Sequence, residues 1–214
     1  MNMIVLYEDD ALIVCVKPSG VLSENSEKPH MVSLIAAHTG AEPFPVHRLD
    51  KETGGVTVYA KTKQAAAELS RQIQQGIFKK RYLAVAQGVF DEKSGEMQDL
   101  LFHDKQKNKT FAVSRQRAGV KTAELSYNVI DEKNGFSLVD IVLRTGRTHQ
   151  IRAQFSSRNH PLFGDRKYGG RAGNLALHAY RLAFSHPHSG EALELEYPPD
   201  FTIPPWNMFG NKKE

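Results

Sequence analysis

The chain has a single cysteine, a single tryptophan and no long apolar run, and these scarcities exclude several classes of protein. One cysteine cannot form an internal disulfide, and Cys15 lies inside the apolar segment ALIVCV, where a small core side chain is expected. That segment is far shorter than the ~20 apolar residues of a membrane-spanning helix. The sequence also starts without a basic leader. We therefore expect a cytoplasmic protein in a reducing compartment.

Several common catalytic motifs are missing. The chain has neither a GxxxxGK phosphate loop nor a GxGxxG dinucleotide loop, so no cradle for a nucleotide cofactor is visible. A GxSxG nucleophile elbow is absent as well. Nine histidines raise the question of a metal site, but His186 and His188 fall in an expected turn at a strand end, and thiolate ligands are lacking. We expect neither a cofactor nor a metal ion.

Positive charge is segregated along the chain, although the net charge is only +4. Residues 104–121 hold six Lys or Arg and one Asp, and residues 144–171 hold seven Lys or Arg and one Asp. Clusters of this kind favour a polyanionic partner, because Lys and Arg neutralise phosphates and release their counterions. The alternative is an ordinary solvated basic surface.

The apolar patterns predict an α+β fold around a mixed, largely antiparallel sheet flanked by helices and loops. Strands are expected over 3–7, 11–17, 55–62, 80–88, 175–187 and 191–199, and a hairpin over 122–146 turns at Asn134-Gly135. Helices are expected over 63–76, with Thr62 as the N-cap and Gly76 at the end, and over 147–160, ending before Pro161. The segment that carries Lys105, Lys107 and Lys109 is expected to be a loop.

The segment His47-Arg48-Leu49-Asp50 places a carboxylate two residues after an arginine. In an extended segment Arg48 and Asp50 share a face, and the following Gly54 and Gly55 let backbone or ligand approach closely. Taken alone, the pattern also fits a turn aspartate paired with a nearby arginine.

A second cluster, RTGRTHQIRAQ, combines basic residues with the start of the expected helix. Arg147 lies at that start, where free N–H groups and the helix dipole favour an anion. His149 and Arg152 share a helix face. A solvated basic helix is the alternative, but it explains Ile151 less well, since this apolar residue stands between two polar ones.

Tyr82 follows three consecutive basic residues at the start of a strand. A tyrosine beside basic residues suits stacking on a nucleobase, worth ~1–3 kcal/mol per base. A half-buried sheet tyrosine is the alternative interpretation.

The order of these clusters resembles the RluA family of RNA pseudouridine synthases. The matching segments are YEDDALIVCVKPSGV, HRLDKETGG, KKRYLAV, GRTHQIRAQ, NHPLFGDRKYGG and LHAYRLAFSHP. The resemblance implies the pseudouridine synthase fold. It also implies conversion of a uridine in RNA to pseudouridine: the N1–C1′ bond breaks, the uracil turns, and C5 joins C1′, without cofactor or metal.

The resemblance also assigns roles to individual residues. Asp50 matches the catalytic aspartate, and Arg152 matches the arginine that pairs with that carboxylate. Tyr82 and Ile151 match the residues on the two sides of the uracil. Arg48 matches the side chain inserted into the RNA where the target base leaves, and such insertion offsets part of the cost of base flipping. Further substrate contacts are expected from His47, Arg147, His149, Lys105, Lys107 and Lys109.

The chain departs from the family pattern at two positions. Gly54 stands where many members have serine, and Gln154 stands where many have histidine, which we expect to alter loop shape and RNA fit. No additional N-terminal RNA-binding module is expected, so residues 1–214 would form a single catalytic domain and a monomer. The RNA, a ribosomal or transfer RNA stem-loop, would then be held by 104–121 and 144–171.

Two other classes of protein remain open. One is an inactive RNA-binding protein or RNA chaperone with the same fold, although it would not need Asp50, Tyr82 and Arg152 together. The other is a carboxylate-based hydrolase, which lacks the second acid that glycoside hydrolysis normally uses.

Overall fold

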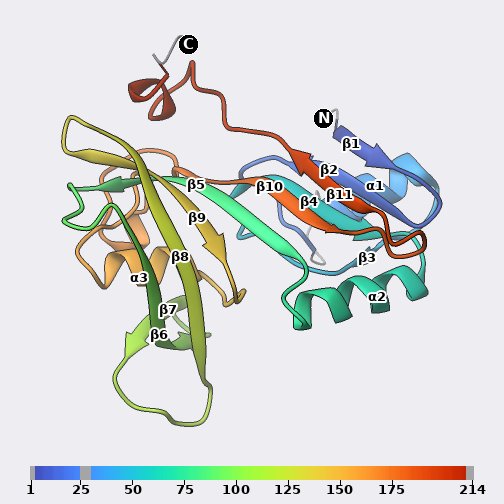
Figure 1. The fold of residues 1–214 in the computed structure, drawn as a ribbon, viewed down its shortest axis with the longest axis horizontal. Helices are drawn as coiled ribbons and strands as arrows, with labels where there is room; N and C mark the ends of the chain where they lie inside the picture. The colour runs from blue at the N-terminus through green and yellow to red at the C-terminus, as the bar shows by residue number, and fades with distance from the viewer. Residues whose placement is uncertain (1–2, 25–29, 211–214) are drawn as a thin grey trace. The chain divides into compact units, whose positions relative to one another are not determined.

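The computed structural model describes residues 3–24 and 30–210. Their contacts divide the chain into two compact units: unit 1 is Met1–Lys80 with His178–Pro198, and unit 2 is Arg81–Leu177 with Pro199–Glu214. The described residues form 11 strands, three α-helices and two short 3-10 helices (Figure 1). The predicted α+β class with a mixed, largely antiparallel sheet is confirmed. The single catalytic domain stays a prediction.

Unit 1 contains a mixed sheet with the strand order β1-β2-β4-β10, in which β11 pairs with β10 and β3 with β4. The pairs are antiparallel except for β4 with β10, which is parallel. The strands are β1 (Ile4–Glu8), β2 (Leu12–Lys17), β3 (Phe44–Pro45), β4 (Gly54–Ala60), β10 (Leu177–Ser185) and β11 (Ala192–Glu196). The helices are α1 (Met31–Thr39) and α2 (Lys63–Gln74).

Strand β2 separates two hydrophobic cores because its side chains alternate across the sheet. Leu12 belongs to the core that includes Leu69 of α2, and Ile13 belongs to the core that includes Ile35 of α1. Cys15 lies fully buried in the second core, and burial raises its pKa to about 12. Its predicted role as a small core side chain is therefore confirmed.

The two helices of unit 1 differ in how clearly their capping residues can be recognised in the sequence. For α2, the Thr62 side chain accepts a hydrogen bond from the Ala65 N–H, and Gly76 has a φ of +70°, as predicted. Helix α1 was not predicted. Its N-cap is His30, whose ring accepts the Ser33 N–H, and histidine is not among the usual N-cap residues.

Unit 2 contains the strand order β5-β9-β8-β6-β7. The strands are β5 (Lys79–Gln87), β6 (Ser94–Asp104), β7 (Lys109–Val113), β8 (Val120–Lys133) and β9 (Phe136–Leu143). The helices are α3 (Gln150–Ser156) and the short η1 (Arg166–Tyr168) and η2 (Trp206–Met208). The predicted hairpin is confirmed: Asn134 and Gly135, with φ of 54° and 76°, connect β8 to β9.

The structure bears out one expectation about unit 2 in part and contradicts another. The expected lysine loop is a turn at Lys105 and Lys107, whereas Lys109 begins β7, which pairs with β6. Helix α3 spans seven residues and begins at Gln150, so Arg147 lies before it rather than at its start. The reason is His149, whose φ of 51° is left-handed and cannot continue an α-helix.

The adjacent glycines at the start of β4 have different steric freedom. Gly55 has a φ of +122°, and a Cβ there would lie 2.0 Å from the Ala179 carbonyl oxygen. At Gly54 the nearest atom to such a Cβ would be the Lys17 carbonyl oxygen at 3.4 Å, which is ordinary contact. The serine that many family members have at position 54 would therefore also fit in this protein.

Gly55→Ala should destabilise the protein by about 3 kcal/mol or more, because the strained φ and the clash add together. Gly54→Ser, the matched control, should change the free energy of unfolding by less than about 0.5 kcal/mol. Urea denaturation of both variants measures the difference. Equal effects of the two substitutions would contradict this account of the strand contact.

Candidate active site

The loop that carries Asp50 is fastened by the carbonyl groups on both sides of that residue. Within unit 1, Ser23 Oγ donates to Leu49 O at 3.0 Å, Lys17 Nζ donates to Lys51 O at 3.1 Å, and Ser19 Oγ donates to Glu52 O at 2.7 Å. All three donors lie at the end of β2 or just after it. The backbone around Asp50 is therefore held in one conformation by the preceding strand and turn.

Lys17 is a functional candidate that the sequence analysis missed. It is fully buried, and its Nζ also donates to Val21 O at 2.6 Å and Pro18 O at 3.0 Å. Burial lowers its pKa to about 8, while the negative charges of Asp50 and Glu52 act in the opposite direction. The available signal was a lysine that ends an otherwise apolar strand.

His47 and Arg48 occupy different environments. His47 Nε2 accepts the Val58 N–H of β4 at 3.2 Å, and its ring centroid lies 5.5 Å from that of Phe78. The Arg48 side chain is 63% exposed, and its Nη1 lies 3.2 Å from Glu24 Oε1. Arg48 is thus accessible, as insertion into RNA would require, whereas His47 supports a strand. Their substrate contacts stay predictions.

In unit 2, Tyr82 lies on β5 with a relative exposure of 6%. The neighbouring Arg81 donates from Nε to Asp140 Oδ1 at 3.3 Å. Successive residues of a strand point to opposite faces, so these two side chains lie on different sides of the sheet. Tyr82 is more buried than the half-buried tyrosine considered from the sequence.

Helix α3 is not a solvated basic helix, because Ile151 and Arg152 are 3% and 4% exposed. Arg152 forms a bidentate ion pair with Asp165: Nε lies 2.7 Å from Oδ2, and Nη2 lies 2.8 Å from Oδ1. The Tyr168 ring centroid lies 5.2 Å from the Arg152 Cζ. Asp165 was not predicted, although it is the only acidic residue in the basic stretch 144–171.

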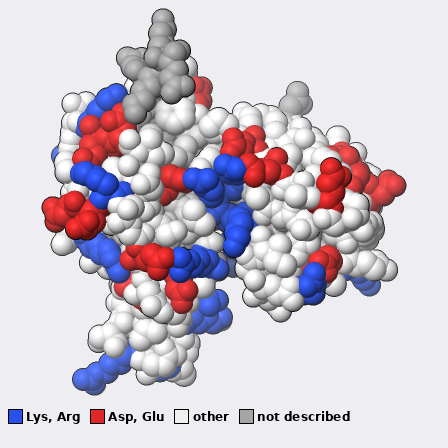
Figure 2. Space-filling model, in the orientation of Figure 1, with Lys and Arg blue, Asp and Glu red and all other residues white. Residues whose placement is uncertain are grey.

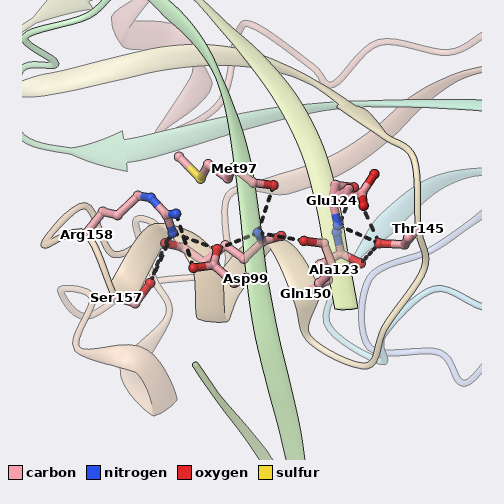
Figure 3. A network of polar contacts seen from close by, with 9 residues as sticks. Met97, Asp99, Ala123, Glu124, Thr145, Gln150, Ser157 and Arg158 are labelled. Atoms are coloured by element: carbon pink, nitrogen blue, oxygen red, sulfur yellow. Dashed lines mark hydrogen bonds and ion pairs between the residues drawn. The ribbon is translucent and has the colours of Figure 1, made fainter. Parts of the chain in front are cut away.

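Polar side chains fasten another side of α3 to the sheet, and Figure 3 shows Asp99, Gln150 and Arg158 of this network. Gln154 belongs to the same network. It is fully buried, and its Nε2 donates to Asp99 Oδ2 at 2.7 Å and Met97 O at 3.2 Å on β6. Arg158 donates to the same carboxylate at 2.8 Å, and Gln150 Nε2 donates to Glu124 O of β8 at 3.0 Å. The departure at Gln154 therefore concerns anchoring of the helix rather than the shape of a loop.

The segment before α3 is also engaged in structural contacts. Arg147 Nε donates to Thr122 O of β8 at 2.9 Å. His149 is buried, and its Nδ1 lies 3.0 Å from the Tyr168 hydroxyl oxygen. Binding of RNA by these two side chains stays a prediction.

The three expected RNA-binding lysines cluster at the hairpin between β6 and β7. Lys105 and Lys107 are exposed in the turn, and Lys109 begins β7. The Lys107 Nζ lies 3.9 Å from Asp104 Oδ2, while the Lys109 Nζ lies 5.5 Å from the Phe111 ring centroid. In Figure 2 the lower end of this sheet is mainly uncharged surface with Lys and Arg at its margins.

The expected site residues fall into both units. Asp50, His47 and Arg48 belong to unit 1. Unit 2 holds Tyr82, Lys105, Lys107, Lys109, Arg147, His149, Ile151 and Arg152. Within unit 2, His149 and Arg152 both contact Tyr168.

Among residues 3–24 and 30–210 there is no group of three or more His, Cys, Asp or Glu that could hold a metal ion. The histidine considered from the sequence is engaged otherwise: His186 Nε2 lies 2.6 Å from Asp9 Oδ2, and its Nδ1 accepts the Ser189 N–H at 3.0 Å. In the same described part of the chain, no helix is long and apolar enough to cross a membrane.

Comparison with known proteins places these residues in a family. The family model described as RNA pseudouridylate synthase matches residues 11–157. This range includes Asp50, Tyr82 and Arg152 and covers more than half of the chain. The chain belongs to the RNA pseudouridylate synthase family.

Individual relatives agree with this assignment. The chain is 36% identical to the ribosomal large subunit pseudouridine synthase D of Neisseria meningitidis serogroup A, over 92% of this chain and 58% of that protein. It is 32% identical to the uncharacterized RNA pseudouridine synthase YlyB of Bacillus subtilis, over 92% of this chain and 69% of that protein. The chain therefore spans somewhat more than half the length of the Neisseria relative.

Solved structures show the same fold. The human RNA pseudouridylate synthase domain containing 1 matches with a TM-score of 0.80 at 23% identity, covering 96% of this chain and 86% of that chain. The human RNA pseudouridylate synthase domain containing 4 matches with a TM-score of 0.75 at 24% identity, covering 92% and 89%. The fold implied by the sequence resemblance is thereby confirmed.

The pKa of His47 yields a test of its structural contact. Burial, together with the charge of Lys80, lowers this pKa from 6.5 to about 3. Between pH 3 and 6.5 the unfolded chain therefore binds more protons than the folded chain, so stability should fall as the pH is lowered through this window. His47→Gln should reduce that loss. Urea denaturation at pH 7, 5 and 4 measures both proteins, and equal pH slopes would exclude His47 as the source.

Proposed function

We propose that this protein is an RNA pseudouridine synthase that isomerises a specific uridine in structured RNA. The observation that carries the proposal is the family match over residues 11–157, which contains HRLD, KKRYLAV and QIR in the family's order. The Neisseria relative is named as an enzyme of the ribosomal large subunit, which favours ribosomal RNA as the first substrate to test. Transfer RNA is the second.

Asp50 is the residue that acts on the ribose of the target uridine. The N1–C1′ bond breaks, C5 bonds to C1′, C5 loses its proton and N1 takes up a proton, so the product is an isomer and the base stays in the RNA. Arg152 would keep the Asp50 carboxylate ionised through charge and hydrogen bonding. The fastened loop around Asp50 supports this role, because a reacting group must be held close to its optimal geometry.

Tyr82 and Ile151 would hold the uracil between them, and Arg48 would occupy the space that the flipped nucleotide leaves. Flipping is required because C1′ and N1 cannot be reached while the base is stacked. The exposed Arg48 side chain supports this assignment. His47, Arg147 and His149 would contribute through the backbone and side-chain contacts that shape the site.

RNA is held by the basic stretches 104–121 and 144–171. The exposed Lys105 and Lys107 at the β6–β7 turn are the main contacts we assign to phosphates. The protein would act in the cytoplasm as a monomer with one catalytic domain. The alternative is an inactive RNA-binding protein of the same fold, which the joint presence of Asp50, Tyr82 and Arg152 argues against.

Asp50→Asn should abolish pseudouridine formation and leave RNA affinity within about threefold, since only the reacting carboxylate is lost. The assay is tritium release from in-vitro transcripts of ribosomal and transfer RNA labelled at uridine C5, combined with filter binding. Asp10→Asn, at an exposed carboxylate of unit 1, is the matched control. Normal activity of Asp50→Asn would refute the mechanism. Release of free uracil would identify a hydrolase, and RNA binding by an inactive wild type would favour the binding protein.

Replacing Lys105 and Lys107 by Gln should weaken RNA binding and flatten its salt dependence. Each lost phosphate contact should reduce the slope by roughly 0.7 on single-stranded RNA, which gives about 1.4 for both. Lys63→Gln with Lys79→Gln removes the same charge from exposed positions of unit 1 and serves as the control. If both double variants keep the wild-type slope, the hairpin turn is a solvated surface.

A further inference from the structure

Tyr168 occupies a junction that the proposed reaction does not explain. It ends the short helix η1, has a relative exposure of 6%, and lies in the same hydrophobic cluster as Leu101 of β6 and Ala153 of α3. Its backbone carbonyl accepts the Ser156 hydroxyl at 2.7 Å, near the end of α3. One residue thus contacts the helix that carries Arg152 and the strands that carry the lysine hairpin.

The Tyr168 hydroxyl group joins two elements through hydrogen bonds. Its oxygen accepts the backbone N–H of Thr110 on β7 at 2.7 Å. The His149 Nδ1 lies 3.0 Å from the same oxygen, at hydrogen-bond distance. His149 is the N-cap of α3, so this hydroxyl group connects the lysine hairpin to the start of that helix.

The Tyr168 ring adds a contact with the proposed catalytic arginine. The Arg152 Cζ lies 5.2 Å from the ring centroid, within the range of a cation–π interaction. The Lys109 Nζ lies 5.1 Å from the same centroid. Asp165 fixes the guanidinium through two hydrogen bonds, and the ring supports it by packing.

A second hydrogen bond strengthens the same connection. The Thr110 hydroxyl group donates to Thr148 O at 2.8 Å, and His103 Nδ1 lies 3.0 Å from the Thr110 Oγ1. Strand β7 is thereby bonded directly to Thr148 and, through the Tyr168 hydroxyl group, to His149. The contacts form a continuous path from the hairpin through Thr110 and Tyr168 to Arg152.

We propose that Tyr168 is a positioning residue that fixes Arg152 relative to the RNA-holding hairpin of β6 and β7. This inference rests on the proposed function, because it concerns the arginine of that reaction. Phosphates held by the hairpin and the ribose next to Arg152 would then keep one geometry during the reaction. A small displacement of a reacting group is enough to slow chemistry strongly.

Tyr168→Phe tests the hydroxyl group, because it removes both hydrogen bonds and keeps the ring. The single-turnover rate of tritium release from a large-subunit ribosomal RNA transcript should fall about tenfold, while the RNA dissociation constant stays within about twofold. Tyr127→Phe is the matched control. This tyrosine of β8 packs its ring against Phe155 of α3, a contact that the substitution keeps, and it loses the hydrogen bond from its hydroxyl group to Glu92 O at 3.3 Å. Tyr168→Leu also removes the ring and should lower the rate further.

A second readout does not depend on activity. The Nε–H of Arg152 is buried against Asp165 and should give a resolved signal in ¹H–¹⁵N spectra. Tyr168→Phe should shift this signal, and Tyr127→Phe should leave it in place. Circular dichroism at the assay temperature ensures that the compared proteins are folded.

The outcomes separate this inference from the proposed function. An active wild type with Tyr168→Phe as fast as Tyr127→Phe overturns the positioning role, as does a loss confined to RNA affinity. A wild type that forms no pseudouridine overturns the proposed function. In that case an unchanged Arg152 signal in Tyr168→Phe also overturns the positioning role, whereas a shifted signal supports it.

Discussion

The buried ion pair between Arg152 and Asp165 is the constraint on which the arrangement of unit 2 depends. Both side chains are almost inaccessible, so neither charge is compensated by water. Removing one partner of such a pair typically costs ~3–5 kcal/mol, because the other charge stays buried. Helix α3 and the segment before η1 must therefore keep their places together. Gln154 and Gln150 of α3 donate to β6 and β8, since a buried polar group needs a partner.

Unit 1 solves a similar problem for Asp50 by a different route. The position of the Asp50 carboxylate depends on the conformation of its loop. The backbone carbonyls next to Asp50 accept hydrogen bonds from Lys17 and from two serines. Lys17 takes the place of a water molecule that the Lys51 carbonyl would otherwise bind. A buried cation surrounded by backbone oxygens holds the loop without placing another side chain at its exposed edge. The two units thus each present one rigid charged group.

The sequence predicted the elements whose signals are local. Strand β2 is a continuous apolar run, α2 has a threonine cap, and the hairpin after β8 has an Asn-Gly turn, so each was found close to its observed bounds. Helix α1 was not predicted, because its N-cap is a histidine. Helix α3 starts later than predicted, because His149 adopts a left-handed conformation. Local patterns do not reveal such choices, since tertiary contacts decide them.

The site residues could be predicted only where the order of motifs along the chain resembled that of a known family. Asp50, Tyr82 and Arg152 came from the family resemblance, whereas Asp165, Tyr168 and Lys17 act through contacts that no spacing rule specifies. Asp165 meets Arg152 across a turn, and Tyr168 reaches Thr110 on a strand far earlier in the chain. The sequence marks Lys17 as a charge at the end of an apolar strand and Asp165 as the one acid in a basic stretch, but it names no partner for either. Their importance appears only once burial and partners are known.

The alternation of side chains along β2 affects how substitutions in the two cores of unit 1 combine. Leu12 and Val14 contribute to one core, and Ile13 and Cys15 contribute to the other, so the backbone of the sheet lies between the two cores. Substitutions in different cores should therefore combine nearly additively, because their side chains lie on opposite faces of the sheet. Side chains of one core can be substituted while the other core keeps its packing. A substitution in one core therefore leaves the other core to hold β2, whose last residue, Lys17, fastens the Asp50 loop.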